Sequence, residues 1–206
     1  MALLVARPEV AVTLSRYDEG EEGPGPHLHR EHADSFILLE GAMRFGIAGS
    51  PRVIGADEAL VAPPGLVHTF LNEHPEPAWW LNFHTPDGGF ADMMRARRDG
   101  REPDAWDSFD AAPEEGLPLA AAFAGPPVAS PWLRIERLDL AAGDEAERRL
   151  EGLAVVAVLG GAAQVQADGL DARLERHGVT TLPPGLEWRF AAEGAAQLLV
   201  AEVAQR

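Results

Sequence analysis

Short apolar runs separated by Gly, Pro, Asn and Asp occupy most of the chain. Between His27 and His84 these runs cover residues 36–40, 43–47, 59–62, 68–71 and 79–83. Short runs at such close spacing, punctuated by turn residues, are typical of antiparallel sandwiches and barrels. The same pattern resumes at Trp132 and continues toward the C-terminus. We therefore predict an all-β protein made of small antiparallel barrels.

One segment follows a helical period instead. Phe90, Met93, Met94 and Arg97 recur at helical spacing, directly after the turn residues Pro86-Asp87-Gly88-Gly89. An acidic residue stands early in this segment and arginines stand late, as the helix dipole favours. The spacing predicts one amphipathic helix of about 10 residues.

Residues 102–131 contain six prolines and an alanine tract, and they follow no lasting period. Proline at this density is incompatible with a long helix or a central strand. We interpret this stretch as a connector that packs on the surface through Trp106, Phe109 and Phe123.

Two blocks of the first half recur in the second half. Residues 39–43 (LEGAM) correspond to residues 159–163 (LGGAA), and residues 62–70 (APPGLVHTF) correspond to residues 182–190 (LPPGLEWRF). A repeat at the period of a whole domain indicates duplication. We therefore divide the chain into an N-terminal barrel (1–100) that ends in the short helix, a Pro/Ala-rich connector (101–131) and a C-terminal barrel (132–206).

Composition excludes several classes of function. A formal net charge of −16 argues against binding to nucleic acid or to anionic membranes. The chain contains no cysteine, and all 17 basic residues are arginine, so thiolate chemistry and lysine Schiff bases are impossible. The longest apolar run, residues 153–159, is far shorter than the ~20 residues of a membrane helix. We expect a cytoplasmic protein.

The residues 26–34 (PHLHREHAD) and the distant residues 63–68 (PPGLVH) carry the candidate chemistry. In a strand, His27 and His29 project from the same face. Asp34 follows after a short polar loop, and His68 comes from another strand. Three imidazoles and one carboxylate form a donor set that suits a divalent transition metal.

These two segments resemble the motifs of the cupin superfamily, which consists of small antiparallel jelly-roll barrels with a metal inside. The first motif is met by His27, His29, Asp34 and Gly41, with Asp34 where the family has Glu. The second motif is met by Pro63, Gly65, His68 and Asn72, with Asp57 where the family has Gly. Asp tolerates turn conformations, so this second departure leaves the expected fold intact.

The resemblance implies that His27, His29, Asp34 and His68 bind one divalent transition metal per chain, namely Fe, Mn, Ni, Co, Cu or Zn. Because Asp is one methylene shorter than Glu, the metal is bound either directly by Asp34, through water, or by the three histidines alone. Glu31 and His32 lie in the same loop and are the rival ligands. Phe36, Leu38 and Phe70 share strand parity with Asp34 or His68, and with Asn72 they are expected to line the pocket.

The second half looks like a degenerate cupin barrel. At an offset of about 120 residues its ligand positions are Ala146, Arg148, Leu153 and Trp188, which offer no equivalent donor set. The chain as a whole therefore resembles a bicupin with a single metal site. In this interpretation the second barrel is a scaffold or the interface of a homodimer.

Two classes of function remain open. The first is a metal-dependent enzyme that acts on a small organic metabolite, with a dioxygenase-like oxidoreductase favoured over an isomerase. The second is a non-catalytic module that binds or senses a small molecule with the help of the metal. His84, at the end of the predicted strand 79–84, is expected on the surface, and no residue outside the metal set is assigned a catalytic role.

Overall fold

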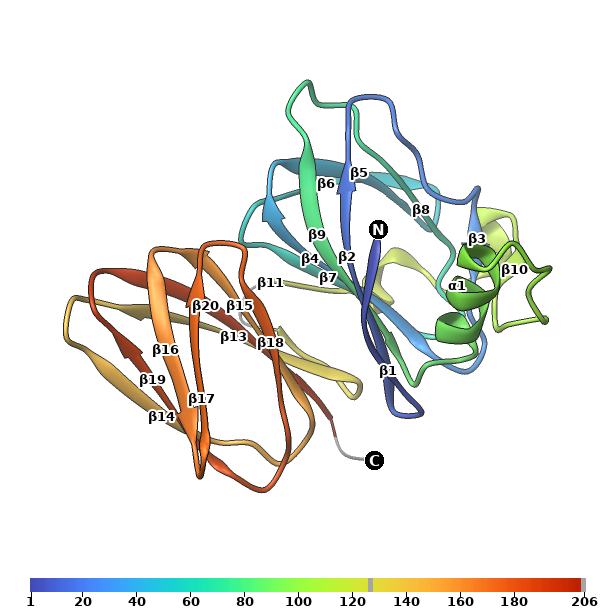
Figure 1. Cartoon of the computed structure of the whole chain (residues 1–206). Helices are drawn as coiled ribbons and strands as arrows, with labels where there is room; N and C mark the ends of the chain where they lie inside the picture. Colours follow the sequence, from blue (N-terminus) through green and yellow to red (C-terminus); the bar gives the residue numbers. More distant parts are fainter. Residues whose placement is uncertain (126–127, 205–206) are drawn as a thin grey trace. The chain divides into compact units, whose positions relative to one another are not determined.

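The computed structural model describes residues 1–125 and 128–204, which form two compact units, Met1–Gly125 and Pro126–Arg206 (Figure 1). Each unit consists of two antiparallel β-sheets, so the predicted all-β class with two barrels is confirmed. In the part of the chain that the structure describes, no helix is long and apolar enough to cross a membrane.

The N-terminal unit contains a six-stranded and a five-stranded sheet. In spatial order the larger sheet comprises β1 (Ala2–Arg7), β2 (Val10–Tyr17), β9 (Ala78–Thr85), β4 (Ala33–Glu40), β7 (Ala59–Ala62) and β11 (Phe123–Gly125). The smaller sheet comprises β10 (Phe109–Asp110), β3 (His27–Leu28), β8 (His68–Leu71), β5 (Ala42–Ile47) and β6 (Ser50–Gly55). Alternate residues of these strands face one interior, as the period of two requires.

The interior of the N-terminal unit is apolar over most of its volume. The central strand β4 contributes Phe36 and Leu38, and β5 contributes Phe45, all fully buried. Phe36 packs edge-on against Phe45, with 4.8 Å between ring centroids. His27, Asp34 and His68 extend the same strand faces beyond this apolar cluster. The barrel thus presents its polar residues at one end of a rigid core.

The segment that follows the first barrel packs within the N-terminal unit. The predicted helix is confirmed as α1 (Phe90–Arg98), with Asp92 in its first turn and three arginines in its last turn. The connector segment includes β10, β11 and the 3₁₀ turns η1 (Pro113–Glu115) and η2 (Leu119–Ala121). β10 pairs with β3, and β11 pairs with β7. Residues 101–125 therefore add one strand to each sheet of the unit.

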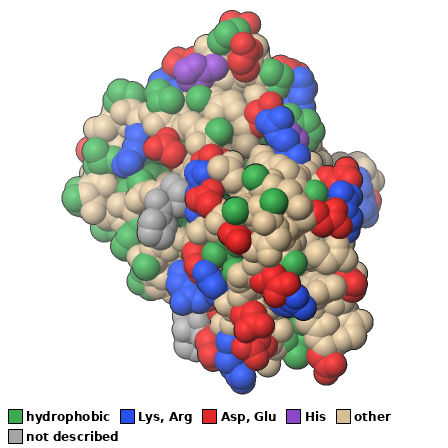
Figure 2. Space-filling model, turned by 90° about the vertical axis from the view of Figure 1, so that its left-hand side faces the viewer, with side chains coloured by type: hydrophobic (Ala, Val, Ile, Leu, Met, Phe, Trp, Pro, Cys, Tyr) green, Lys and Arg blue, Asp and Glu red, His purple; other side chains and the backbone are tan. Residues whose placement is uncertain are grey.

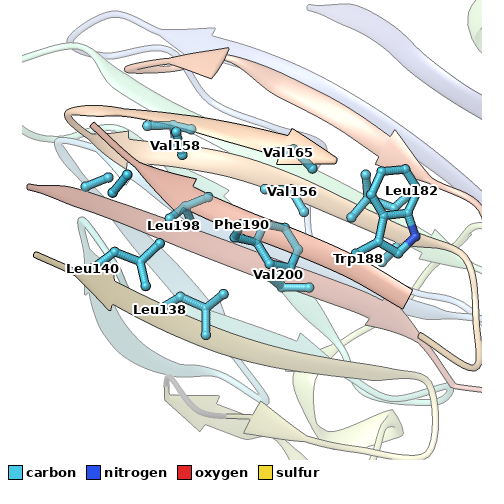
Figure 3. Packing of buried hydrophobic residues seen from close by; sticks show 14 of the residues in the cluster. Leu138, Leu140, Val156, Val158, Val165, Leu182, Trp188, Phe190, Leu198 and Val200 are labelled. Atoms are coloured by element: carbon cyan, nitrogen blue, oxygen red, sulfur yellow. The ribbon is translucent and has the colours of Figure 1, made fainter. Parts of the chain in front are cut away.

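The C-terminal unit contains a five-stranded and a four-stranded sheet. The first comprises β12 (Val128–Ala129), β13 (Leu133–Leu140), β20 (Ala196–Val203), β15 (Ala154–Gly160) and β18 (Val179–Leu182). The second comprises β14 (Glu145–Arg149), β19 (Glu187–Ala192), β16 (Ala162–Ala167) and β17 (Leu170–Glu175). Their inward side chains form one core cluster, which includes Val156, Trp188 and Phe190 (Figure 3).

Backbone details repeat between the units and support a duplication. Strand β4 has a register irregularity between Leu38 and Glu40, and β15 has one between Val158 and Gly160. Left-handed backbone also recurs in pairs: Gly41 and Gly161, Gly65 and Gly185, Asp57 and His177. The left-handed φ of 68° at Asp57 shows that this Asp adopts the turn conformation for which the family motif has Gly.

The strand register corrects the positions that correspond to the metal ligands. Arg148 pairs with Trp188 as His27 pairs with His68, and Ala154 pairs with Leu182 as Asp34 pairs with Ala62. Gly185 donates to the carbonyl of Leu150 as Gly65 donates to that of His29. The equivalent set is therefore Arg148, Leu150, Ala154 and Trp188; the predicted use of Ala146 and Leu153 was wrong.

Trp188 stabilises the second barrel by packing. Its side chain is 3% exposed, it belongs to the core cluster, and its indole N–H donates to the carbonyl of Pro183 at 3.3 Å. We expect Trp188→His to lower the free energy of unfolding by about 3 kcal/mol, because it creates a cavity and buries an unpaired imidazole. Urea unfolding measures this change. Glu187→Gln, on the exposed face of the same strand, is the matched control, and equal stability of the two variants would contradict the role of Trp188.

Candidate metal centre

Four predicted ligands meet at one end of the N-terminal barrel. His27 lies on β3, His29 follows directly after β3, Asp34 lies on β4, and His68 begins β8. One ligand atom from each lies within 4.8 Å of the others, and all four residues are buried, with at most 3% exposed. The register explains the meeting, because His27 pairs with His68 across the β3–β8 ladder. The spacing in the sequence thus becomes a single cluster, which we call the His–Asp cluster.

Hydrogen bonds fix the orientation of the three imidazoles. The Nδ1 atom of His27 lies 2.9 Å from the carbonyl of Gly25, and that of His68 lies 3.0 Å from the carbonyl of Leu66. Nδ1 of His29 bonds the carbonyl of Asp107. A carbonyl only accepts, so each Nδ1 carries a hydrogen, and in the neutral imidazole Nε2 then carries the lone pair. An outer hydrogen bond of this kind is typical of histidines that bind metals.

The carboxylate of Asp34 faces these nitrogens. Its Oδ2 lies 3.2 Å from Nε2 of His68 and 3.5 Å from Nε2 of His29. Burial by itself raises the pKa of Asp34, but the imidazoles of His84, His29 and His68 outweigh it and lower this pKa well below its usual range. Desolvation also lowers the pKa of His27 to about 4. Near neutral pH the cluster therefore contains an ionised carboxylate beside an unprotonated His27.

With neutral imidazoles, lone pairs meet in the His–Asp cluster with no hydrogen between them. Nε2 of His29 is buried and has no hydrogen-bond partner, and Nε2 of His68 faces a carboxylate oxygen rather than a donor. Such an arrangement is unfavourable unless a cation or additional protons occupy the centre. Neutral imidazole nitrogens and a carboxylate oxygen are suitable ligands for a divalent transition metal. The residues present therefore fit a metal.

A second group of polar side chains continues from Asp34 toward the loop that follows β3. Oδ1 of Asp34 accepts from the amide of Asn82, whose Oδ1 lies 3.0 Å from Nε2 of His84. Nδ1 of His84 lies 2.9 Å from Nε2 of His32. His29, His32 and His84 form a further group whose ligand atoms lie within 4.8 Å of one another.

The structure corrects the expected position of His84 and distinguishes the two rival ligands, Glu31 and His32. His84 was predicted on the surface, but it is 2% exposed, because β9 places it opposite Asp34. The alternation of Trp80, Asn82 and His84 on one strand face was the signal that could have located it. Of the two rival ligands, His32 is fully buried beside the cluster, whereas Glu31 is exposed.

Asp107 positions the loop that carries His29 and His32. Its carboxylate accepts from the backbone N–H groups of Arg30, Glu31 and His32 at 2.8–3.2 Å and lies 2.8 Å from Nδ1 of His32. Partial burial raises the pKa of Asp107, but the bonds from Arg30 and Glu31 outweigh it and lower this pKa below its ordinary value. Sequence reasoning missed Asp107, which lies in the connector segment with no motif around it.

A cavity of about 350 Å³ opens beside the His–Asp cluster. Its polar wall is formed by His27, Asp34, Asn82 and His84. The rest of the wall consists mainly of aromatic and methionine side chains: Tyr17, Phe70, Trp80, Phe90, Met93, Met94 and Trp106. A mostly apolar cavity with a few convergent polar groups has the composition of a small-molecule site.

The four predicted pocket residues lie in three kinds of place. Phe70 lines the cavity. Phe36 and Leu38 are fully buried in the apolar core, where the ring of Phe36 lies 5.9 Å from that of His68. Asn72 is buried in the turn after β8, where its amide donates to the carbonyls of Tyr17 and Glu76 at 3.1 and 3.0 Å. Its side chain therefore fixes a turn.

The comparisons with known proteins agree with this architecture. Residues 13–84 match the sequence model of the family described as Cupin domain. Among solved structures, salicylate 1,2-dioxygenase from Pseudaminobacter salicylatoxidans is similar over 95% of this chain and 71% of that chain, with a TM-score of 0.67 and 16% identity. A variant of the enzyme in complex with gentisate is similar over 95% of this chain and 69% of that chain, with a TM-score of 0.65 and 20% identity.

AerE from Microcystis aeruginosa is similar over 96% of this chain and 88% of that chain, with a TM-score of 0.67 and 12% identity. No curated protein sequence matches significantly. Identities this low establish the fold alone. The predicted cupin domain is thereby confirmed for residues 13–84, and the fold of the whole chain is similar to that of these structures.

Removal of the Asp107 carboxylate should loosen the loop that carries His29 and His32. We expect Asp107→Ala to lower the free energy of unfolding by about 1–3 kcal/mol, because three backbone N–H groups lose a charged acceptor. Hydrogen exchange at Arg30, Glu31 and His32 should accelerate in parallel. The matched control is Asp104→Asn, an exposed acid on the same segment. Unchanged exchange at these three amides would show that the carboxylate does not hold the loop.

Proposed function

We propose that this bicupin chain is a metal-dependent enzyme that acts on a small organic metabolite, with dioxygenase-like oxidoreductase chemistry. The observation that carries the proposal is the convergence of inward-facing lone pairs from His27, His29 and His68 on the Asp34 carboxylate, since three N–H bonds to carbonyls direct them there. The adjacent cavity supplies space for an organic molecule.

A comparison of the two units supports one divalent transition metal per chain. The first unit offers three imidazoles and a carboxylate, whereas Arg148, Leu150, Ala154 and Trp188 occupy the equivalent positions of the second unit. Fe, Mn, Ni, Co, Cu and Zn all accept nitrogen and oxygen ligands. A metal bound here would supply Lewis-acid or redox chemistry to a substrate in the cavity.

The chain's own residues would prepare the site in three ways. The carbonyls of Gly25, Leu66 and Asp107 hold the imidazole hydrogens away from the metal position. His84 and Asn82 bring hydrogen-bonding atoms to the cavity wall, where they would orient a polar group of the substrate. The aromatic walls exclude water from the reacting end of the substrate.

An oxygenase is favoured because two kinds of support agree. Salicylate 1,2-dioxygenase has the same fold over most of this chain, and a structure of it contains gentisate, a small aromatic molecule. In this chain the cavity beside the His–Asp cluster is lined by aromatic rings that suit a flat ligand. A small-molecule substrate and no nucleic-acid partner are consistent with the net charge of −16.

Removal of a ligand should strip the metal while the barrel stays folded. We expect His27→Ala and His68→Ala to retain less than about a tenth of the metal of the wild type, a loss beyond that caused by changes outside the ligand set. Elemental analysis measures metal per chain, and circular dichroism checks the fold. His74→Ala, in a loop outside the cluster, is the control. Full metal content in both cluster variants would remove the basis of the proposal.

Asp34 should matter less than the histidines, and Glu31 should not matter. A water can replace a single carboxylate ligand, so Asp34→Ala should weaken metal binding by about 10–100-fold without abolishing it. Glu31→Ala should leave the affinity unchanged, because Glu31 is exposed. Competition with a chromogenic chelator provides both constants. A larger loss of metal affinity in Glu31→Ala than in Asp34→Ala would show that the acidic ligand has been misassigned.

Oxygen uptake tests the chemistry directly. We expect at least one aromatic or enolic compound to cause metal-dependent consumption of dioxygen, measured with an oxygen electrode on the Fe, Mn, Co, Ni and Cu forms. The matched control is His68→Ala treated with the same metals. If no compound is oxidised but one is bound tightly, the chain is a metal-assisted binding module and the enzymatic proposal fails.

A further inference from the structure

Two groups of aromatic rings line the cavity beside the His–Asp cluster. In the first, Tyr17, Phe70 and Trp80 contact one another, with ring centroids 5.2–6.0 Å apart. In the second, Phe90 of α1 lies 5.3 Å from Trp106 and stacks on His84 at 3.7 Å. This many rings favour a ligand with a flat apolar body rather than a flexible polar chain.

The charged lining of this cavity is sparse and asymmetric. Its charged side chains are those of Asp34, which is buried, and of Glu22 and Arg97, both exposed; Met1, with its amino group, also lines the cavity. Asp34 already accepts from Asn82 and lies beside the imidazoles. Arg97 is the one arginine in the lining, in a chain whose net charge of −16 otherwise repels anions.

Arg97 differs from its neighbours on the same helix. Arg95 pairs with Asp92 at 2.6 Å, and Arg98 pairs with Asp99 at 2.9 Å. Acidic and basic side chains are similarly intermixed on the face of the molecule in Figure 2. Among the described residues, no carboxylate forms an ion pair with Arg97. Its guanidinium is therefore available to a ligand.

A second unpaired donor belongs to a residue that lines the same cavity. The side chain of Trp80 is fully buried, and its indole N–H has no hydrogen-bond partner. A buried donor without an acceptor is unfavourable, so a ligand that brings an acceptor gains binding energy there. Arg97 and Trp80 thus both line the cavity and both have an unpaired donor, which favours a ligand that supplies oxygen acceptors.

We infer that this cavity takes an organic acid: a flat, apolar molecule with an anionic group that Arg97 binds at the mouth. The inference rests on the proposed function, because it names the substrate class of that same site. Arg97 is assigned as a residue that determines specificity rather than as a catalytic residue. A guanidinium presents parallel donors that match a carboxylate, which explains the preference for this anion.

Benzoate and benzamide test the inference, because they share a ring and nearly share a size but differ in charge. Binding is measured by quenching of tryptophan fluorescence, since Trp80 and Trp106 both line the cavity. The full chain is used, first with metal removed by a chelator and then with metal restored. We expect the wild type to bind benzoate about tenfold more tightly than benzamide at low salt, and this preference to shrink as salt increases.

Three variants locate the charge. Arg97→Gln should remove the preference for benzoate while leaving the affinity for benzamide unchanged. Arg95→Gln is the matched control, because Arg95 lies on the same helix, pairs with Asp92 and does not line the cavity, and it should keep the preference. Glu22→Gln should tighten benzoate binding, because it removes the exposed acidic side chain of the cavity lining.

The outcomes separate this inference from the proposed function. Three results would overturn the inference. The wild type could bind the two probes with equal affinity, or bind neither at millimolar concentration. Arg97→Gln could also weaken the binding of both probes equally. The comparison is also made on metal-free protein, so a chain that binds no metal can still show the preference for benzoate. Conversely, a metal-loaded chain without this preference would retain the proposed function and lose the assigned substrate class.

Discussion

The site depends on one electrostatic constraint: three buried imidazoles commit the hydrogen on Nδ1 to backbone carbonyls. In their neutral form, His27, His29 and His68 therefore turn unprotonated nitrogens toward one another and toward an ionised carboxylate. Each carbonyl belongs to a different part of the N-terminal unit, so the barrel, its ligand loops and the connector segment all contribute to it. These mutually repulsive lone pairs are held together by the strand register, the tight turns and the long-range bonds of Asp107.

The two units show how the same backbone behaves with and without this constraint. Where the first unit has histidines and Asp34, the second has Arg148, Leu150, Ala154 and Trp188, and its interior is closed by apolar packing (Figure 3). Arg148 turns to Glu136 at the edge of the sheet, so the charge at this position has a partner of opposite sign. The second barrel can therefore be stable without a cation, whereas the first concentrates its polar residues at one end.

Much of this was accessible from the sequence, because spacing in short strands translates directly into shared faces. The alternation of turns and apolar runs predicted the class, and the two motifs predicted that His27, His29, Asp34 and His68 would meet. The equivalent positions of the second barrel were partly missed because its loop is one residue shorter: Arg148 to Ala154 replaces His27 to Asp34, so a constant offset fails. Asp107 could not be predicted, since it lies 75 residues beyond His32 in a segment without periodicity.

The sequence separation between His32 and Asp107 affects the order in which the site forms during synthesis. All four residues of the His–Asp cluster precede residue 69, yet the carbonyl that orients His29 and the carboxylate that holds its loop arrive with residue 107. A nascent chain that has emerged from the ribosome only as far as α1 contains every candidate ligand but lacks this bracing. Since a polypeptide appears from its N-terminus at about 5–20 residues per second, the centre acquires its final geometry seconds after its ligands exist. The order of synthesis thus separates the appearance of the ligands from the completion of the site.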